Sequence, residues 1–259
     1  MKKRICTLLL ALCLTLGLLP AAAQAAGDGS GTFDTVRWTL DADGGLTVSG
    51  TGDLPDSAFA GRTDIVTVTF TGQVARIGRS AFAGCTQLRR VDGFGAVTCV
   101  MSQAFAGCTA LTELAVPGTV TEIGTGAFSA CTGLTAVTLA PGVRSLGAYA
   151  FAACTALRRI DLPDGMTLLG SGLFSGCTAL TELPLPDDVA WVEPRLCENC
   201  TALQNIVLPA AMTEVPRGLL RGCTGLRRVT LQGAVTAVGN GAFAGCDALA
   251  DVYFTGTRA

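Results

Sequence analysis

Cysteine recurs at a constant interval of 23 residues through most of this 259-residue chain. The surrounding residues repeat in step, so that an Ala-Phe pair precedes five of these cysteines, with its phenylalanine at Phe82, Phe105, Phe128, Phe151 and Phe243. Phe59 extends the series by one period, which gives about nine units from residue 57 to residue 259. A fixed period of this length predicts a stacked solenoid in which each unit buries its apolar side against its neighbours. The cysteines of the series are Cys85, Cys108, Cys131, Cys154, Cys177, Cys200, Cys223 and Cys246.

Each unit is predicted to hold one short strand and a return segment. In residues 134–156, Val137 and Leu139 alternate as inward positions of a strand, and Pro141 follows as a breaker. Equivalent prolines can turn the chain without removing a ladder hydrogen bond. The return half predicts a shorter extended segment and then a single helical turn. The fold class is therefore an α/β solenoid, mainly β, a right-handed coil of about nine rungs.

The amino-terminal 26 residues have the features of a secretory signal peptide. Three basic residues precede an apolar stretch from Ile5 to Leu19, which is shorter than the ~20 residues of a membrane span. Small residues at Ala23 and Ala25 place cleavage near Ala25 or Ala26. We therefore expect a secreted, extracellular protein, either free or associated with the cell surface, with no transmembrane segment in the mature chain.

Residues 27–56 are predicted to form an amino-terminal cap, which leaves 57–259 as the solenoid. Val36, Trp38 and Leu40 alternate, and Gly44 and Gly45 follow where a tight turn needs positive φ. These features predict a β-hairpin over residues 33–50. A solenoid exposes the apolar face of its first coil unless such a cap covers it.

The repeat resembles a known family at this level of detail. The unit at residues 111–132, Leu-Thr-Glu-Leu-Ala-Val-Pro-Gly-Thr-Val-Thr-Glu-Ile-Gly-Thr-Gly-Ala-Phe-Ser-Ala-Cys-Thr, is similar to the BspA-type leucine-rich repeat. Residues 38–50 resemble the hairpin that often precedes such repeats. Members of that family are mostly bacterial cell-surface or secreted proteins, and some bind host matrix proteins. The resemblance therefore implies a recognition or adhesion role through protein binding.

The composition argues against catalysis and against nucleic-acid binding. The chain has no histidine, so it lacks Ser-His and Cys-His nucleophile systems and histidine-ligated metal sites. We expect no enzyme activity, no cofactor and no metal; Asp164 with Asp187 and Asp188 is a weak calcium candidate that is better explained by solvated turns. Loss of the signal peptide removes three of 18 basic residues and none of the 20 acidic ones, giving a net charge of −5. That balance disfavours a general nucleic-acid partner.

The cysteines are interpreted first as core residues. The eight-membered series falls at the inward position of the repeat, and stacked Cβ atoms point the same way, so we expect a structural ladder of free buried thiols. Cys197 and Cys200 have the C-x-x-C spacing of a redox pair or half a zinc site, but both fall in core columns. Cys99 lies in a column of mostly polar residues and is expected to be exposed.

Arginine pairs return every third rung of the predicted strand face. They are Arg89-Arg90, Arg158-Arg159 and Arg227-Arg228. With rungs ~4.8 Å apart, the pairs are roughly 14 Å apart, a spacing that suits an acidic or sulfated macromolecule, either a protein or a glycan. The alternative is that Arg90 pairs with Glu113, Arg159 with Glu182 and Arg228 with Asp251 on the next rung, which holds the ladder in register. That scheme leaves one arginine of each pair without a partner.

Two functional hypotheses follow. In the first, the protein is a non-enzymatic recognition module that binds a macromolecule through its strand face. In the second, it is a structural spacer, or a fragment of a larger surface protein, that associates through an open coil at its carboxyl end, where Tyr253 and Phe254 lie.

Overall fold

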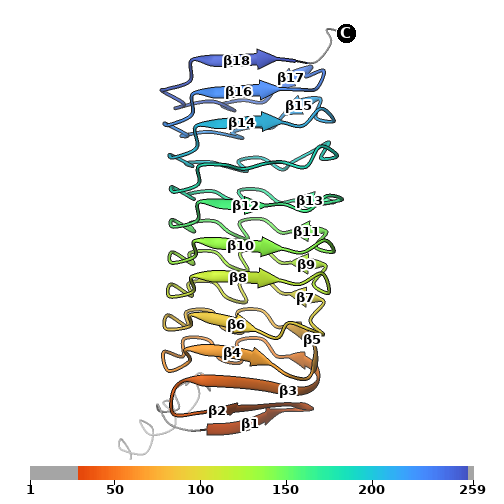
Figure 1. Ribbon diagram of the computed structural model, residues 1–259, viewed down its shortest axis with the longest axis vertical. Helices are drawn as coiled ribbons and strands as arrows, with labels where there is room; N and C mark the ends of the chain where they lie inside the picture. The colour runs from red at the N-terminus through yellow and green to blue at the C-terminus, as the bar shows by residue number, and fades with distance from the viewer. Residues whose placement is uncertain (1–28, 256–259) are drawn as a thin grey trace, which may run out of the picture.

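The protein is a straight stack of β-coils (Figure 1). A computed structural model describes residues 29–255, so the predicted signal peptide lies outside the described residues. The 18 strands of this range build about nine coils, and no helix occurs between residues 29 and 255. The mainly β solenoid predicted from the 23-residue period is confirmed.

One long side of the stack carries the first strand of each coil. Neighbouring strands pair in parallel with a constant offset of 23 residues, for example Ala136 with Glu113 and with Arg159. Residues at one position of the repeat therefore form a column up the molecule. The strands of this side are β4 (Thr67–Phe70), β6 (Arg90–Asp92), β8 (Glu113–Val116), β10 (Ala136–Leu139), β12 (Arg159–Asp161), β14 (Asn205–Leu208), β16 (Arg228–Leu231) and β18 (Asp251–Phe254).

The return side carries shorter parallel strands. The return strands are β5 (Gln73–Ile77), β7 (Cys99–Val100), β9 (Glu122–Ile123), β11 (Ser145–Leu146), β13 (Leu168–Leu169), β15 (Glu214–Val215) and β17 (Ala237–Val238). Two-residue segments are enough here because those from β7 to β15 each contribute one buried side chain, such as Ile123 or Leu146, to the core.

The amino-terminal cap contains the predicted hairpin and one further strand. The hairpin strands β2 (Val36–Leu40) and β3 (Gly45–Leu54) pair antiparallel, and Gly44 has the positive φ of 83° that their turn requires. A strand that the sequence did not predict, β1 (Gly29–Phe33), adds to the outside of β2. The Trp38 ring meets Phe59 edge-on at a centroid distance of 5.6 Å and so covers the first coil.

Phenylalanines stack face to face along the centre of the solenoid. Consecutive rings from Phe59 to Phe151 are 5.0–5.5 Å apart, and the last stacked pair, Phe151 and Phe174, is 6.1 Å apart. Cys197 and Leu220 continue this column as buried residues, as their positions predicted. No polar or charged side chain of residues 29–255 is fully buried. Apolar packing between coils therefore stabilises the stack.

The helical turn predicted after each return strand is wrong. Around Phe82, the N–H groups of Ala81, Ala83 and Cys85 donate to carbonyls three residues earlier, which makes successive tight turns. The N–H groups between them, at Ser80, Phe82 and Gly84, donate instead to carbonyls of the next coil. Because alternate N–H groups bond to the next coil, a helix cannot form.

The strand-side ladder is interrupted at two places. No pairing joins β6 to β8, and residues 182–185 form no strand, in contrast to the strand predicted for every unit. Only an isolated bridge between Arg159 and Glu182 joins these residues to β12. Pro184 lies in the middle of this rung, where other rungs have Thr138 or Asp161, and its missing N–H cannot continue a ladder.

Candidate functional site

The candidate site lies on the strand face, defined as the outward residues of the first strand of each coil, the arginines at positions 89, 158 and 227 just before three of these strands, and residues 181–185. Alternation along each strand turns Val137 and Leu139 into the core and Ala136 and Thr138 to the surface. The arginine pairs straddle the strand start: Arg89, Arg158 and Arg227 lie one residue before a strand, while Arg90, Arg159 and Arg228 are its first residues. All six are exposed. The fold therefore places the six predicted residues on one face.

The second arginine of each pair is held by carboxylates. Arg159 contacts Asp161 on its own strand and Glu182 on the next rung, both at 2.8 Å. The hydrogen bond with Asp161, the nearby charge of that carboxylate and then Glu182 raise the pKa of Arg159. Arg228 lies 3.4 Å from Asp251 and 5.1 Å from the Tyr253 ring centroid. These two arginines therefore pair with the next rung as predicted.

The partner predicted for Arg90 is wrong. Arg90 contacts Asp92 at 2.7 Å, not Glu113. Two residues along a strand point to the same face, so an aspartate at that spacing is as close as a residue on the next rung. The missed signal is the Arg-x-Asp spacing, which also recurs at Arg159 and Asp161.

The first arginine of each pair has no ionic partner in the part of the chain that the structure describes. Within residues 29–255, no carboxylate oxygen lies within 4.0 Å of Arg89, Arg158 or Arg227. Their three guanidinium groups repeat every third rung on one face. They can form charge-assisted hydrogen bonds with an external anion without first breaking an internal ion pair.

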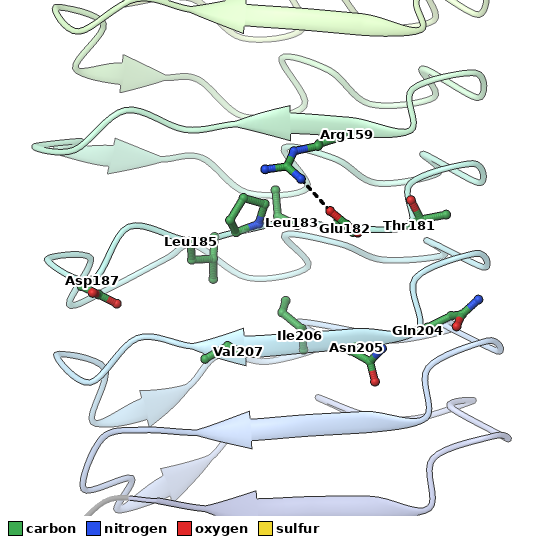
Figure 2. A pocket seen from close by; sticks show the side chains of 11 residues that line it. Arg159, Thr181, Glu182, Leu183, Leu185, Asp187, Gln204, Asn205, Ile206 and Val207 are labelled. Carbon is green, nitrogen blue, oxygen red and sulfur yellow. Dashed lines mark hydrogen bonds and ion pairs between the residues drawn. The ribbon is translucent and has the colours of Figure 1, made fainter.

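A hollow opens on the strand face beside Arg159, at the second ladder interruption (Figure 2). Its volume is about 590 Å³. Arg159 and Glu182 lie at one side, Gln204 and Asn205 at the other, and Leu185 and Val207 supply apolar surface. Sequence reasoning missed this feature, although Pro184 in a strand column was its signal.

The cysteine series lies in the core, on the segment that joins each return strand to the first strand of the next coil. Each thiol donates to a backbone carbonyl 26 residues earlier, with Sγ–O distances between 3.0 and 3.2 Å. Seven members are buried and Cys246 is half-buried, and all are free thiols. Burial raises the pKa of Cys85, Cys131 and Cys177 to about 12. A thiol with such a pKa is unreactive at neutral pH.

The other candidate residues do not form a site. Cys197 and Cys200 are both buried in the core, and Cys99 is only half-buried. Asp188 accepts a hydrogen bond from the Gly165 N–H at 2.9 Å, as a turn residue does. No group of three or more Cys, Asp or Glu residues within 29–255 is arranged to hold a metal ion. The same residues contain no helix that is long and apolar enough to span a membrane.

Comparisons with known proteins agree with this geometry. A sequence model described as the BspA type leucine rich repeat region matches residues 52–177 and 144–258. A leucine-rich repeat protein from Bacteroides ovatus has a similar structure, with 23% identity and a TM-score of 0.69 over 89% of this chain and 70% of that one. A leucine-rich repeat protein from T. pallidum is 24% identical, with a TM-score of 0.59 over 86% of this chain and 91% of the other. At these identities the likeness supports the fold alone. No curated protein matches the chain.

Proposed function

Because this chain belongs to the BspA-type leucine-rich repeat family, we propose that it is a non-enzymatic recognition module, secreted or displayed at the cell surface, which binds a macromolecule through its strand face. Repeat solenoids present extended faces of this kind to their partners. The apolar stretch Ile5–Leu19, with its basic flank, supports export of the chain.

The three unpaired arginines carry the proposal. Arg89, Arg158 and Arg227 are exposed, lack a carboxylate within 4.0 Å in the described chain, and repeat at equal spacing on one face. Such an array is suited to bind a partner whose acidic groups repeat at the spacing of the three arginines. Surface arginines needed only for register would be paired, as Arg159 and Arg228 are.

The test is binding to a panel of immobilised matrix proteins and sulfated glycans. We expect salt-sensitive binding to at least one member, and its loss when Arg89, Arg158 and Arg227 are all changed to serine. The matched control changes Arg37, Arg76 and Arg144, which lie off the strand face, to serine. Its net charge is therefore equal to that of the test variant. Equal loss in both variants, or retention in both, would contradict the proposal.

A second candidate function is that of a spacer that assembles through its carboxyl-terminal coil. Val252 and Phe254 of β18 are 44% and 68% exposed, whereas Val229 and Leu231 at the same positions one coil earlier are 0% and 2% exposed. An uncovered strand of this kind is a template for pairing. This candidate requires concentration-dependent association in sedimentation experiments that Phe254→Asp abolishes.

A further inference from the structure

We infer that the hollow at the second ladder interruption, together with Arg158 and Arg227, binds an extended peptide in which two acidic residues flank an aliphatic one, in the order acid-x-aliphatic-x-acid. This inference rests on the proposed function of the strand face and specifies its ligand. The peptide would run along the solenoid axis, across the rungs. Its two acidic side chains would reach the two arginines, and the aliphatic side chain would enter the hollow.

The hollow exists because the chain cannot complete its ladder here. Pro184 ends the pairing with β12 after a single bridge, and no pairing within residues 29–255 joins this rung to β14. Leu185 consequently remains half-buried, while Val116 and Leu208 in the same column are 2% and 1% exposed. Val207 on the other side is 46% exposed. The interruption thus leaves Leu185, an inward residue, partly in contact with solvent, next to the outward residue Val207 of β14.

Cationic groups lie on both sides of the hollow. Arg158 is one rung before it and Arg227 one rung after it, and neither has a carboxylate within 4.0 Å in the part of the chain described. Arg159, at the edge of the hollow itself, is already bound by Asp161 and Glu182. Free positive charge is therefore concentrated at the two ends of the site, with none at its centre.

The spacing of these groups matches an extended peptide. Three rungs of ~4.8 Å separate Arg158 from Arg227, which is about 14 Å. In an extended chain, residues i and i+4 point to the same side and are also about 13–14 Å apart at ~3.3–3.4 Å per residue. Residue i+2 lies midway on that side, opposite the gap between residues 182–185 and β14. One five-residue segment can therefore satisfy all three positions.

The polar side chains of the hollow fit a peptide backbone. Gln204 and Asn205 are exposed on its wall, and each carries one amide acceptor and two donors. These groups complement the N–H and C=O groups that an extended chain presents between its side chains. Figure 2 shows both residues on the wall across from Glu182.

The charges in the hollow disfavour a sulfated glycan. Glu182 and Asp187 line it, and they repel a chain that carries anionic groups along its whole length. A peptide with acidic residues only at positions i and i+4 avoids this repulsion. The hollow also distinguishes this site from the interval between Arg89 and Arg158. There β8 and β10 are paired, so that interval has no gap at its centre for an aliphatic side chain.

The experiment measures binding of the fluorescein-labelled peptide Ser-Gly-Asp-Thr-Leu-Thr-Asp-Gly-Ser to the purified full chain by fluorescence anisotropy. We expect saturable binding that weakens about tenfold when either Arg158 or Arg227 is changed to serine. Each variant loses one charge-assisted hydrogen bond between an arginine and a peptide carboxylate. Arg37→Ser, an exposed position on β2 away from the strand face, should leave the affinity unchanged. Replacing the peptide leucine by serine should weaken binding by a similar factor.

A second pair of variants tests the hollow without removing charge. Val207→Tyr places a bulky side chain in it, and the equivalent position on β18 already holds Tyr253, so the fold accepts an aromatic residue in this column. Thr138→Tyr makes the same change on β10, where the ladder is intact. We expect Val207→Tyr alone to abolish peptide binding, with both variants equally folded by circular dichroism.

Three results would overturn the inference: no peptide binding up to about 1 mM, equal binding of the leucine and serine peptides, or equal effects of Val207→Tyr and Thr138→Tyr. Arginine-dependent binding of a sulfated heparin fragment, unaffected by Val207→Tyr, would assign the face to a glycan instead. The proposed function is judged separately, because the matrix panel and the triple arginine variant do not depend on the peptide.

Discussion

At the scale of single residues, the buried thiols show how the repeat selects cysteine. The inward position after the Phe column offers little space and one backbone carbonyl, and a thiol fills the space while donating a weak hydrogen bond to Phe105 or Phe128. Desolvation keeps these thiols protonated and raises the pKa of Cys131 to about 12. Ten free cysteines of residues 29–255 are thereby compatible with an exported protein.

Alkylation distinguishes the half-buried from the buried thiols. We predict that iodoacetamide at pH 8 modifies Cys99 first and Cys246 more slowly, because these are the only partly accessible thiols among the ten cysteines of residues 29–255. Desolvation, and then the charge of Glu122, raises the pKa of Cys99, so its rate should be below that of a free thiol. Peptide mapping by mass spectrometry measures each site, and Cys99→Ser should remove the fastest phase. Equal labelling of Cys131 in the native protein would contradict the buried ladder.

At the scale of strands and turns, the sequence predicted the position of a residue where only one local requirement applies. It failed where a residue has two possible partners. The Cys and Phe columns, and the turn at Gly44, each follow from a single local requirement. By contrast, Arg90 had two carboxylates within reach, and only the fold decides for Asp92 over Glu113. The turns around Phe82 also depend on hydrogen bonds to the next coil, which a single unit does not contain. The hollow arises from a missing N–H at Pro184 and from the packing of three rungs together.

The role of proline in the ladder can be reproduced on an intact strand. β10 has partners on both sides, so Thr138→Pro must remove one ladder donor and leave a carbonyl without its partner. We predict that it lowers the free energy of unfolding by about 1–3 kcal/mol relative to Thr138→Ala. Pro184→Ala, where the ladder is already open, should change stability by less than about 1 kcal/mol. Guanidinium unfolding curves measure all three. Equal stability of the proline and alanine variants at position 138 would show that the ladder contributes little.

At the scale of the whole molecule, the same buried columns of side chains continue from the cap towards the last coil. The small contributions of equivalent residues to the free energy of unfolding therefore add up. The seven coils that contain Cys85 to Cys223 each bury an equivalent Phe, Cys or Leu side chain and an equivalent thiol against their neighbours. Nearest-neighbour packing of this type makes stability a sum over interfaces. A property common to the buried cysteines should therefore appear in the stability of the entire stack.

The combined contribution of the buried thiols should appear as a loss of stability at alkaline pH. The native pKa of Cys85, Cys131 and Cys177 is raised to about 12 from the ordinary value of 9.0, so these thiols stabilise the fold fully below pH 9. Between pH 9 and 12 the unfolded chain loses thiol protons that the folded chain retains, and each buried thiol then lowers the free energy of unfolding by up to about 1.4 kcal/mol per pH unit. We predict a steep loss of stability from pH 9 to 10.5, measured by urea unfolding under reducing conditions. A variant with Cys131→Ala and Cys177→Ala should be less stable at pH 8 but show a shallower pH slope. The same slope in both proteins would mean that groups other than the buried thiols govern alkaline unfolding.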